Sequence, residues 1–100
     1  MEVLVASTAD IKPGQMIGIE RENKSILIAN VDGIYFAIDD ICTHRGCNIS
    51  TGELKGDQAI CPCHGTIYDV KTGAVVKGPA KKPVYSYPLK VEGSEISVTV

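Results

Sequence analysis

Two short stretches in the middle of the chain decide how it must fold. Residues 42–47 read CTHRGC, and residues 61–69 read CPCHGTIYD. Together they hold all four cysteines and both histidines of the sequence. In a chain without a visible secretory signal, clustered Cys and His mark a metal site more often than a disulfide framework. The sequence therefore predicts a metal centre built from two loops.

Length and charge limit what the rest of the chain can do. The 100 residues are 44% hydrophobic, which suits one small domain rather than two independent cores. The formal net charge of −2 offers no basic excess for phosphates, so we expect no nucleic-acid partner. No apolar run approaches the roughly 20 residues that span a bilayer. The N-terminus shows no signal-peptide pattern, so we expect no membrane span and a cytoplasmic location.

Strand signals fill most of the sequence, whereas helical periodicity is almost absent. Short runs rich in Val, Ile, Tyr and Phe recur between turns that contain Gly or Asp, and Asp32-Gly33 suits a tight hairpin. This spacing is typical of an antiparallel β-sandwich or barrel, so the predicted fold class is all-β. The expected strands are residues 2–7, 15–20, 24–30, 33–39, 58–60, 66–70, 74–77, 84–91 and 95–100.

The chain is expected to form one domain, residues 1–100, that has two parts. Residues 1–40 and 84–100 carry the better strands and form a β scaffold. Residues 41–83 hold the cysteines, the histidines and most of the glycines, so we interpret them as a loop-rich, metal-stapled insertion. An insertion of this kind has little core of its own, and a bound metal would supply much of its order.

Each loop supplies one mixed pair of candidate ligands, C-x-H from the first and C-x-x-H from the second. A zinc site of the two-Cys, two-His type usually takes its cysteines from one segment and its histidines from another, so a structural zinc module is the remote alternative. In one kind of [2Fe–2S] cluster, one iron is bound by two thiolates and the other iron by two imidazoles. Each loop must then supply one ligand to each iron, and a Cys and a His a few residues apart on one loop can do so. The c-type haem motif is absent, because Cys61 and Cys63 have one residue between them rather than two.

The two loops resemble those of the Rieske family of [2Fe–2S] proteins. The matching motifs are C-T-H-x-G-C and C-P-C-H-G-T-x-Y-D, and the Gly-Pro-Ala of residues 78–80 resembles the proline-containing loop of that family. The resemblance covers about residues 40–90. It implies a Rieske-like fold, with a cluster-binding subdomain on a β scaffold, and one [2Fe–2S] cluster per chain. The implied ligands are Cys42 and Cys61 on one iron and His44 and His64 on the other.

The two remaining cysteines, Cys47 and Cys63, also take a role from the resemblance. They match the pair that forms an inter-loop disulfide in the branch found in cytochrome bc-type complexes, a pair that small oxygenase-type Rieske ferredoxins usually lack. A disulfide closing a loop of roughly 15 residues contributes about 3 kcal/mol in the chain-entropy model. The alternative is two unpaired buried thiols, because cytoplasmic disulfides are rare.

Residues around the ligands are expected to tune the cluster. Tyr68 sits where the bc-type branch has a tyrosine donating to a ligand sulfur, and Thr66 where it has a serine donating to a bridging sulfide. Gly46 and Gly65 are ordinary turn glycines or, beside a cluster, let backbone N–H groups approach sulfur. Pro79 would shield the cluster.

Charge arithmetic explains what this ligand set would do. Two ferric ions and two sulfides sum to +2, so two thiolates give a neutral cluster, whereas four thiolates give −2. Adding an electron to a neutral centre is easier, which places Rieske potentials at about −150 to +300 mV against about −400 mV for plant-type clusters. We expect a midpoint in the middle to upper part of that range. Because reduction raises the basicity of bound imidazoles, the midpoint should fall as the pH rises.

The implied function is one-electron transfer by a small, soluble carrier similar to Rieske-type ferredoxins, including archaeal ones of this size. No acid–base dyad or nucleophile pattern appears in the sequence, so we expect no catalytic residue and no enzyme activity of its own. Expected partners are reductase and oxidase or oxygenase components, which would bind a monomer transiently. The alternative is a subunit or domain of a larger oxidoreductase, such as a bc-type complex, a ring-hydroxylating oxygenase system or a nitrite reductase.

Positive charge gathers next to the proline-containing loop. Lys77, Lys81 and Lys82 lie on either side of Pro79 in the sequence. A solvated loop is the simpler interpretation, and a docking surface for an acidic redox partner is the alternative. Arg45 lies inside the first loop, beside a ligand position, and is expected to face solvent.

Overall fold

The computed structural model describes residues 1–43, 46–63 and 65–100. These residues form eleven strands, two short 3-10 helices and no α-helix, so the predicted all-β fold class is confirmed. The 3-10 helices are η1 (Thr8–Asp10) and η2 (Ile49–Thr51). The strands are β1 (Glu2–Ser7), β2 (Met16–Arg21), β3 (Lys24–Val31), β4 (Ile34–Asp39), β5 (Glu53–Lys55), β6 (Gln58–Ile60), β7 (Ile67–Asp69), β8 (Val75–Lys77), β9 (Ser86–Tyr87), β10 (Leu89–Glu92) and β11 (Glu95–Thr99).

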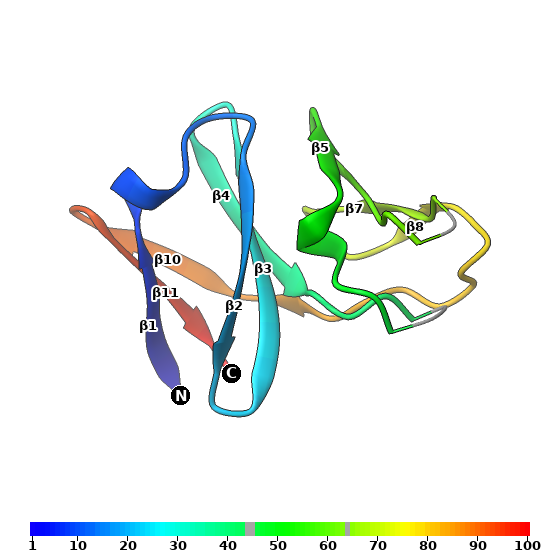
Figure 1. Ribbon diagram of the computed structural model, residues 1–100. Helices are drawn as coiled ribbons and strands as arrows, with labels where there is room; N and C mark the ends of the chain where they lie inside the picture. The colour runs from blue at the N-terminus through cyan, green and yellow to red at the C-terminus, as the bar shows by residue number, and fades with distance from the viewer. Residues whose placement is uncertain (44–45, 64) are drawn as a thin grey trace.

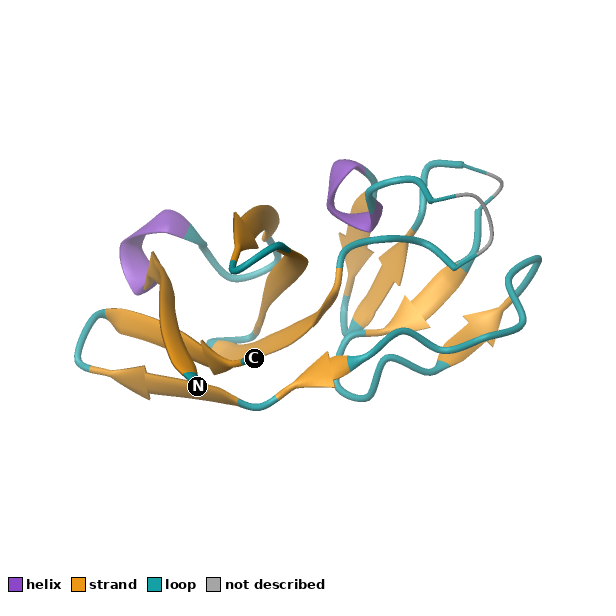
Figure 2. Ribbon diagram, turned by 90° about the horizontal axis from the view of Figure 1, so that it is seen from below, coloured by secondary structure: helices purple, strands orange, loops and turns teal. Residues whose placement is uncertain are grey.

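The strands pair into three antiparallel sheets, ordered β1-β11-β10, β2-β3-β4-β9 and β5-β6-β7-β8. In Figures 1 and 2 the first two sheets lie together at one end of the molecule, and the third forms the other end. The shape is accordingly elongated, 38 × 27 × 19 Å. The chain passes to the third sheet after β4 and returns at β9. None of the described helices is long or apolar enough to cross a membrane.

The hairpin between β3 and β4 follows from its turn residues. Asp32 and Gly33 have φ angles of 53° and 91°. Two successive residues with positive φ are the geometry of the tight turn that joins twisted antiparallel strands, and Asp-Gly adopts it readily. The backbone N–H of Gly33 donates to the side-chain oxygen of Asn30 at 2.7 Å, which fixes the turn. The hairpin predicted at Asp32-Gly33 is therefore confirmed.

The buried strand β3 explains how the two ends of the molecule share a core. Successive side chains of a strand point to opposite faces. Ile26 and Ile28 pack into a cluster with the sheet of β1, β10 and β11, whereas Leu27 and Ala29 pack toward the third sheet. All four side chains are fully buried. The second cluster includes, beyond β3, the buried residues Ile38, Cys42, Ile49, Ala59, Cys61, Tyr68, Val70, Ala80 and Val84.

Three local predictions differ from the structure. The strand expected over residues 84–91 is two strands in different sheets, because Pro88 has no backbone N–H to continue a ladder. Strand β5 was not expected, since its three residues contain only one apolar side chain. Helix η1 was also not expected, although Ser7 caps it and Asp10 accepts a hydrogen bond from the Ser7 N–H, which completes a capping box.

Candidate metal centre

Two buried cysteines lie side by side where the scaffold meets the third sheet. Cys42 follows β4 by three residues, Cys61 directly follows β6, and their exposures are 1% and 0%. Burial is the largest cause of a raised pKa of the Cys61 thiol, and the hydrogen bond to Cys42 also raises this pKa. The hydrogen bond with the backbone N–H of Cys63 lowers the pKa in part. A cation would be required to hold both sulfurs as thiolates here. This pair therefore suits one metal ion with two sulfur ligands.

The first loop is closed by its own backbone. The N–H of Cys42 donates to the carbonyl of Cys47 at 2.8 Å, and the N–H of Gly46 donates to the carbonyl of Cys42 at 2.8 Å. Gly46 has a φ of 74°, which glycine adopts without strain. Ile41 and Asn48, which flank the loop on either side, form an isolated antiparallel β-bridge. The loop between residues 42 and 47 is thus held at both ends.

The second loop is built in a similar way. The N–H of Cys61 donates to the carbonyl of Thr66 at 2.8 Å, so the chain turns back between the end of β6 and the start of β7. Gly65 has a φ of 75° within this turn. The positive φ confirms that both predicted loop glycines occupy positions that favour glycine. Their contact with cluster sulfur stays a proposal.

A disulfide joins the two loops. The sulfurs of Cys47 and Cys63 are 2.08 Å apart, and their Cα atoms are 6.4 Å apart. Both residues also pack against the core cluster that contains Cys42 and Cys61. The disulfide that the resemblance implied is therefore present, and it holds the two loops next to each other.

Tyr68 hydrogen-bonds to a predicted ligand. Its ring is fully buried, and its hydroxyl oxygen lies 3.2 Å from the Cys42 sulfur. The same oxygen accepts the backbone N–H of Thr43 at 3.1 Å. The Thr43 hydroxyl donates to the carbonyl of Lys82, so it can only accept from the phenol, which lies 3.2 Å away. The phenolic proton therefore points toward Thr43 or, when Cys42 is a thiolate, toward its sulfur.

The proline loop, residues 78–82, contacts both cysteine loops. The backbone N–H of Ala80 donates to the Thr66 hydroxyl at 3.1 Å, and both residues are buried. At the other end of the proline loop, the Lys82 carbonyl accepts from Thr43. Pro79 itself is exposed and follows a cis peptide bond. Because Thr66 uses its oxygen as an acceptor for Ala80, its own proton can be donated elsewhere, as the predicted sulfide contact requires.

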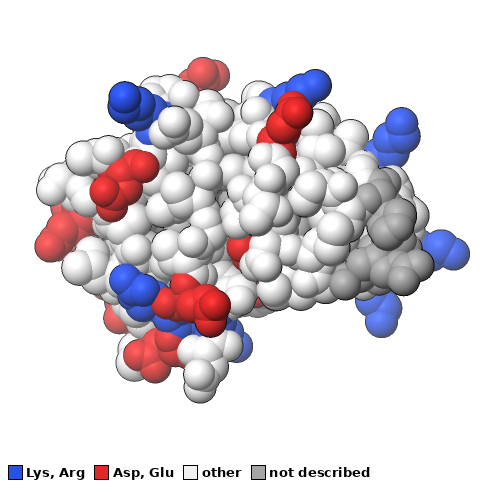
Figure 3. Space-filling view, in the orientation of Figure 1, with Lys and Arg blue, Asp and Glu red and all other residues white. Residues whose placement is uncertain are grey.

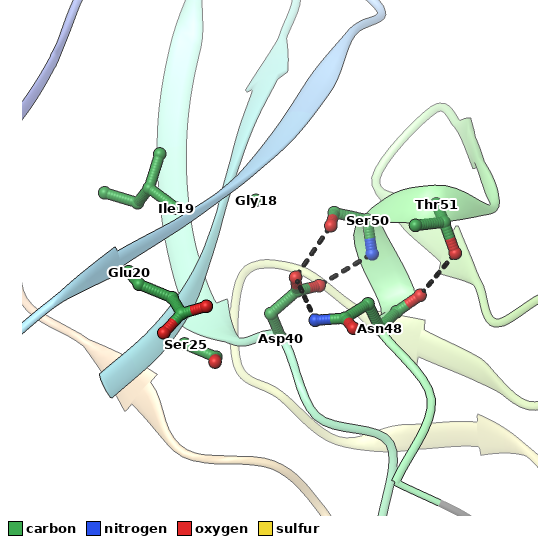
Figure 4. Close-up of a pocket in the computed structure, with 8 residues that line it drawn as sticks. All are labelled: Gly18, Ile19, Glu20, Ser25, Asp40, Asn48, Ser50 and Thr51. Carbon is green, nitrogen blue, oxygen red and sulfur yellow. Dashed lines mark hydrogen bonds between the residues drawn. The ribbon is translucent and has the colours of Figure 1, made fainter. Parts of the chain in front are cut away.

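A buried carboxylate, which the sequence analysis missed, fixes the base of the first loop. Asp40 is 2% exposed and accepts hydrogen bonds from the Ser50 N–H at 2.6 Å, the Ser50 hydroxyl at 2.7 Å and the Asn48 side chain at 3.1 Å. Figure 4 shows these bonds converging on Asp40 beside Gly18 of β2. A Cβ atom at Gly18 would meet Ser50 and Asp40 side-chain oxygens, so a larger residue there would have to displace the groups that form this network. The position of Asp40, two residues before Cys42, was the available sequence signal.

The other predicted ligands, His44 and His64, lie outside the described residues, as does Arg45. What the structure brings together is the two predicted cysteine ligands, the disulfide, Tyr68, Thr66 and the proline loop. These described residues come from three segments that are far apart in sequence. The donor set fits a cluster with sulfur ligands on one side, and the sequence places one histidine in each loop.

Comparison with known proteins agrees with this geometry. The Rieske [2Fe-2S] domain model matches residues 1–88. The biphenyl 2,3-dioxygenase ferredoxin component of Rhodococcus jostii is 34% identical over 94 residues, which are 94% of this chain and 88% of that protein. The ferredoxin of carbazole 1,9a-dioxygenase from Nocardioides aromaticivorans has a similar structure, with a TM-score of 0.93 and 28% identity over 98% of this chain and 96% of that chain.

A further solved structure is a complex of reduced oxygenase and oxidized ferredoxin in carbazole 1,9a-dioxygenase. It contains a chain that matches this one with a TM-score of 0.91 and 28% identity, over 97% of this chain and 91% of that chain. The family match extends over far more than half of the sequence. From the match and the paired buried thiols we conclude that the chain belongs to the Rieske [2Fe–2S] domain family, and that it is a one-electron carrier with one [2Fe–2S] cluster rather than an enzyme in its own right.

Proposed function

We propose that the cluster is held by Cys42 and Cys61 on one iron and by His44 and His64 on the other. Two buried thiols in hydrogen-bonding contact support the first half of this assignment. The second half is supported by the sequence, which places one histidine two or three residues after each of these cysteines. When bound, the cluster accepts and releases one electron at a time.

We propose that residues around the cluster raise its reduction potential. Tyr68 and Thr66 offer hydroxyl donors, and the disulfide and the core exclude water from the thiolates. Hydrogen bonds to sulfur and burial are the terms that tune an iron–sulfur potential within its class. A midpoint in the middle to upper part of about −150 to +300 mV follows. A strongly negative midpoint in a redox titration would refute this.

We propose that the protein passes electrons from a reductase to the oxygenase component of a ring-hydroxylating system. The observation that carries this proposal is the match over nearly the whole chain to a ferredoxin seen in complex with an oxygenase. The full-length similarity to a dioxygenase ferredoxin component points the same way. The disulfide is the feature that sets this chain apart from the pattern of small oxygenase-type ferredoxins.

The test is reconstituted turnover. Holo-protein is combined with a purified reductase and the terminal oxygenase of a carbazole-type dioxygenase system, and hydroxylated product is measured. We expect product only when the holo-protein is present, with the Cys42→Ser variant as the inactive control. If the reduced protein is never reoxidised by the oxygenase, the oxygenase assignment fails. If it is reoxidised by a cytochrome of a bc-type chain instead, the alternative of a larger respiratory assembly replaces it.

We also propose a cytoplasmic location, which the sequence analysis favours. Similarity to ferredoxin components of dioxygenase systems is compatible with it but names no compartment. Fractionation of the source cells, followed by immunodetection, tests the location. Detection in a membrane or exported fraction would refute it.

A further inference from the structure

Three exposed lysines stand on or beside the proline loop without partners among the described residues. Lys77, Lys81 and Lys82 form no salt bridge there, whereas Lys55, Lys71 and Lys90 each lie within 4 Å of a carboxylate. A paired lysine has its charge largely compensated. The three unpaired ammonium groups therefore present their full charge to whatever approaches this end of the molecule.

Backbone contacts place these lysines over the cluster-binding loops. Lys77 of β8 lies opposite Ile67 of β7 in the sheet. Ile67 follows the predicted ligand His64 by three residues in the sequence. The Lys82 carbonyl accepts from Thr43, which adjoins the predicted ligand Cys42. Lys81 lies between Lys82 and Ala80, whose N–H is bonded to Thr66. The three lysines thus lie on segments that are bonded directly to residues of the two cysteine loops or of the strand that follows the second loop.

Most acidic side chains lie elsewhere on the molecule, because residues 41–83 contain six Lys and Arg but only three acidic residues, Glu53, Asp57 and Asp69. In Figure 3 the outer margin of the end that carries the third sheet shows blue basic groups, a red group stands beside a blue one nearer the middle of the molecule, and most of the red groups lie toward the opposite end. The formal net charge of the whole chain is −2. The protein is therefore polarised, with a basic end on a weakly acidic body.

Two apolar residues next to these lysines in the sequence are exposed. Val76 of β8 is 50% exposed, and Pro79, between Lys77 and Lys81 in the sequence, is exposed as well. An apolar centre with a charged rim is the usual anatomy of a protein interface. Three lysines on a chain with net negative charge are too few to hold a nucleic acid. The combination suits a small, transient protein contact of the kind made by redox partners.

We propose that Lys77, Lys81 and Lys82 form a docking surface for a redox partner whose own electron-entry site is acidic. This inference rests on the proposed electron-carrier function and adds the chemistry of the partner. Opposite charges steer the encounter and raise its rate at low ionic strength, while the exposed Pro79 offers an apolar contact between the lysines. The net negative charge of the chain would by itself favour a basic partner. The preference for an acidic partner therefore depends on where the lysines lie.

The experiment measures electron exchange with reduced or oxidised cytochrome b5, a small acidic haem protein, in the downhill direction. Second-order rates are recorded by stopped flow against ionic strength. Holo-protein is compared with the Lys81→Glu/Lys82→Glu variant and with a control, Lys12→Glu/Lys24→Glu, whose exposed lysines lie on the scaffold and whose change in net charge is the same. The midpoint potential of each variant is measured, so that rates are compared at known driving force.

We expect the rate of the unaltered protein to fall as salt is added, and the Lys81→Glu/Lys82→Glu variant to be slower by about tenfold or more at low salt. The control variant should stay within about twofold. Equal slowing of both variants, or a rate that rises with salt in the unaltered protein, overturns the docking surface. Failure of the holo-protein to be reduced by dithionite would instead refute the electron-carrier function.

Discussion

The hydroxyl of Tyr68 contacts the sulfur of Cys42, one of the predicted cluster ligands. The phenol is buried, so it does not exchange its hydrogen bond with water, and its oxygen lies 3.2 Å from the sulfur. A hydrogen bond from an O–H group stabilises a thiolate more strongly when the iron bound to that thiolate carries less positive charge. We therefore propose that this hydrogen bond would be stronger after reduction of a bound cluster and would raise its potential.

We predict that Tyr68→Phe lowers the midpoint potential of the holo-protein. If the hydrogen bond is stronger by about 1 kcal/mol after reduction, its loss corresponds to roughly 40 mV for one electron. Potentiometric titration measures the shift. Tyr35→Phe is the matched control, because its hydroxyl contacts backbone carbonyls of Thr8 and Ile11 in the scaffold, and its potential should not change. An unchanged midpoint in Tyr68→Phe would contradict the role of Tyr68.

A second tyrosine ties the scaffold to the segment that returns from the cluster loops. The Tyr87 hydroxyl donates to the Asp39 carboxylate at 2.7 Å, and burial together with this bond raises the pKa of the phenol. We predict that Tyr87→Phe lowers the free energy of unfolding by about 1.5–3 kcal/mol at neutral pH, as loss of a charge-assisted hydrogen bond does.

The pH dependence of this pair has a definite sign. Because the folded state raises the pKa of Tyr87, the stabilisation is complete below the ordinary tyrosine pKa of 10.0 and is lost as the pH rises above it. Denaturant unfolding from neutral to alkaline pH should therefore show a steeper decline for the unaltered protein than for Tyr87→Phe. Tyr85→Phe, at a ring that is 60% exposed, serves as the control and should change stability little. Parallel alkaline declines in all three proteins would refute the prediction.

At the level of elements, Asp40 connects β4, the first cysteine loop and η2. Its carboxylate accepts three hydrogen bonds, and its own backbone N–H donates to the Ser25 carbonyl at 2.9 Å. We predict that Asp40→Asn lowers the free energy of unfolding by about 2–3 kcal/mol, because the new amide N–H groups would face donors. Chemical denaturation measures the change.

The control for this variant is an exposed aspartate with a charged partner. Asp57 lies 2.9 Å from Lys71, and that salt bridge holds the pKa of Asp57 below its usual range. Exposed ion pairs contribute little to stability, so Asp57→Asn should cost much less than Asp40→Asn. Equal effects of the two substitutions would show that the Asp40 network does not fix the loop.

How far the sequence predicts these elements depends on how local their causes are. The β3–β4 hairpin and the two cysteine loops are predictable, because Asp32-Gly33 and the loop glycines act through their own backbone angles. The break at Pro88 has a local cause, the missing N–H of proline, that the sequence analysis did not use. Strand β5 is hard to predict because only one of its three residues is apolar, and the pairing of β9 with β4 is hard to predict because the two strands are distant in sequence. The role of Asp40 is hard to predict from the sequence, because its hydrogen-bond donors at residues 48 and 50 come close to its carboxylate only in the folded chain.

At the scale of the whole molecule, the third sheet has less core of its own than the scaffold. Its strands, β5 to β8, are each three residues long, and its buried cluster includes the predicted ligands Cys42 and Cys61. We propose that residues 41–83 behave as a unit whose order depends on the cluster and the disulfide, as metal-dependent folds do.

We predict that removing iron with a chelator raises amide hydrogen exchange in residues 41–83 far more than in β2, β3 and β4. Mass spectrometry of peptic fragments measures this. Reduction of the Cys47–Cys63 disulfide in the iron-free protein should increase exchange further, because the cross-link restrains the unfolded loops by about 3 kcal/mol. A uniform rise over the whole chain would contradict the division into a scaffold and a dependent unit.

The most direct test of the account concerns the unsymmetrical ligand set. Protein grown with ¹⁵N-labelled histidine is purified anaerobically, assayed for iron and acid-labile sulfide, reduced, and studied by electron–nuclear double resonance. We predict equal amounts of iron and sulfide, two of each per chain, and hyperfine couplings from two histidine nitrogens. Zinc in place of iron, or a reduced cluster without histidine nitrogen couplings, would contradict the assignment of His44 and His64 as ligands.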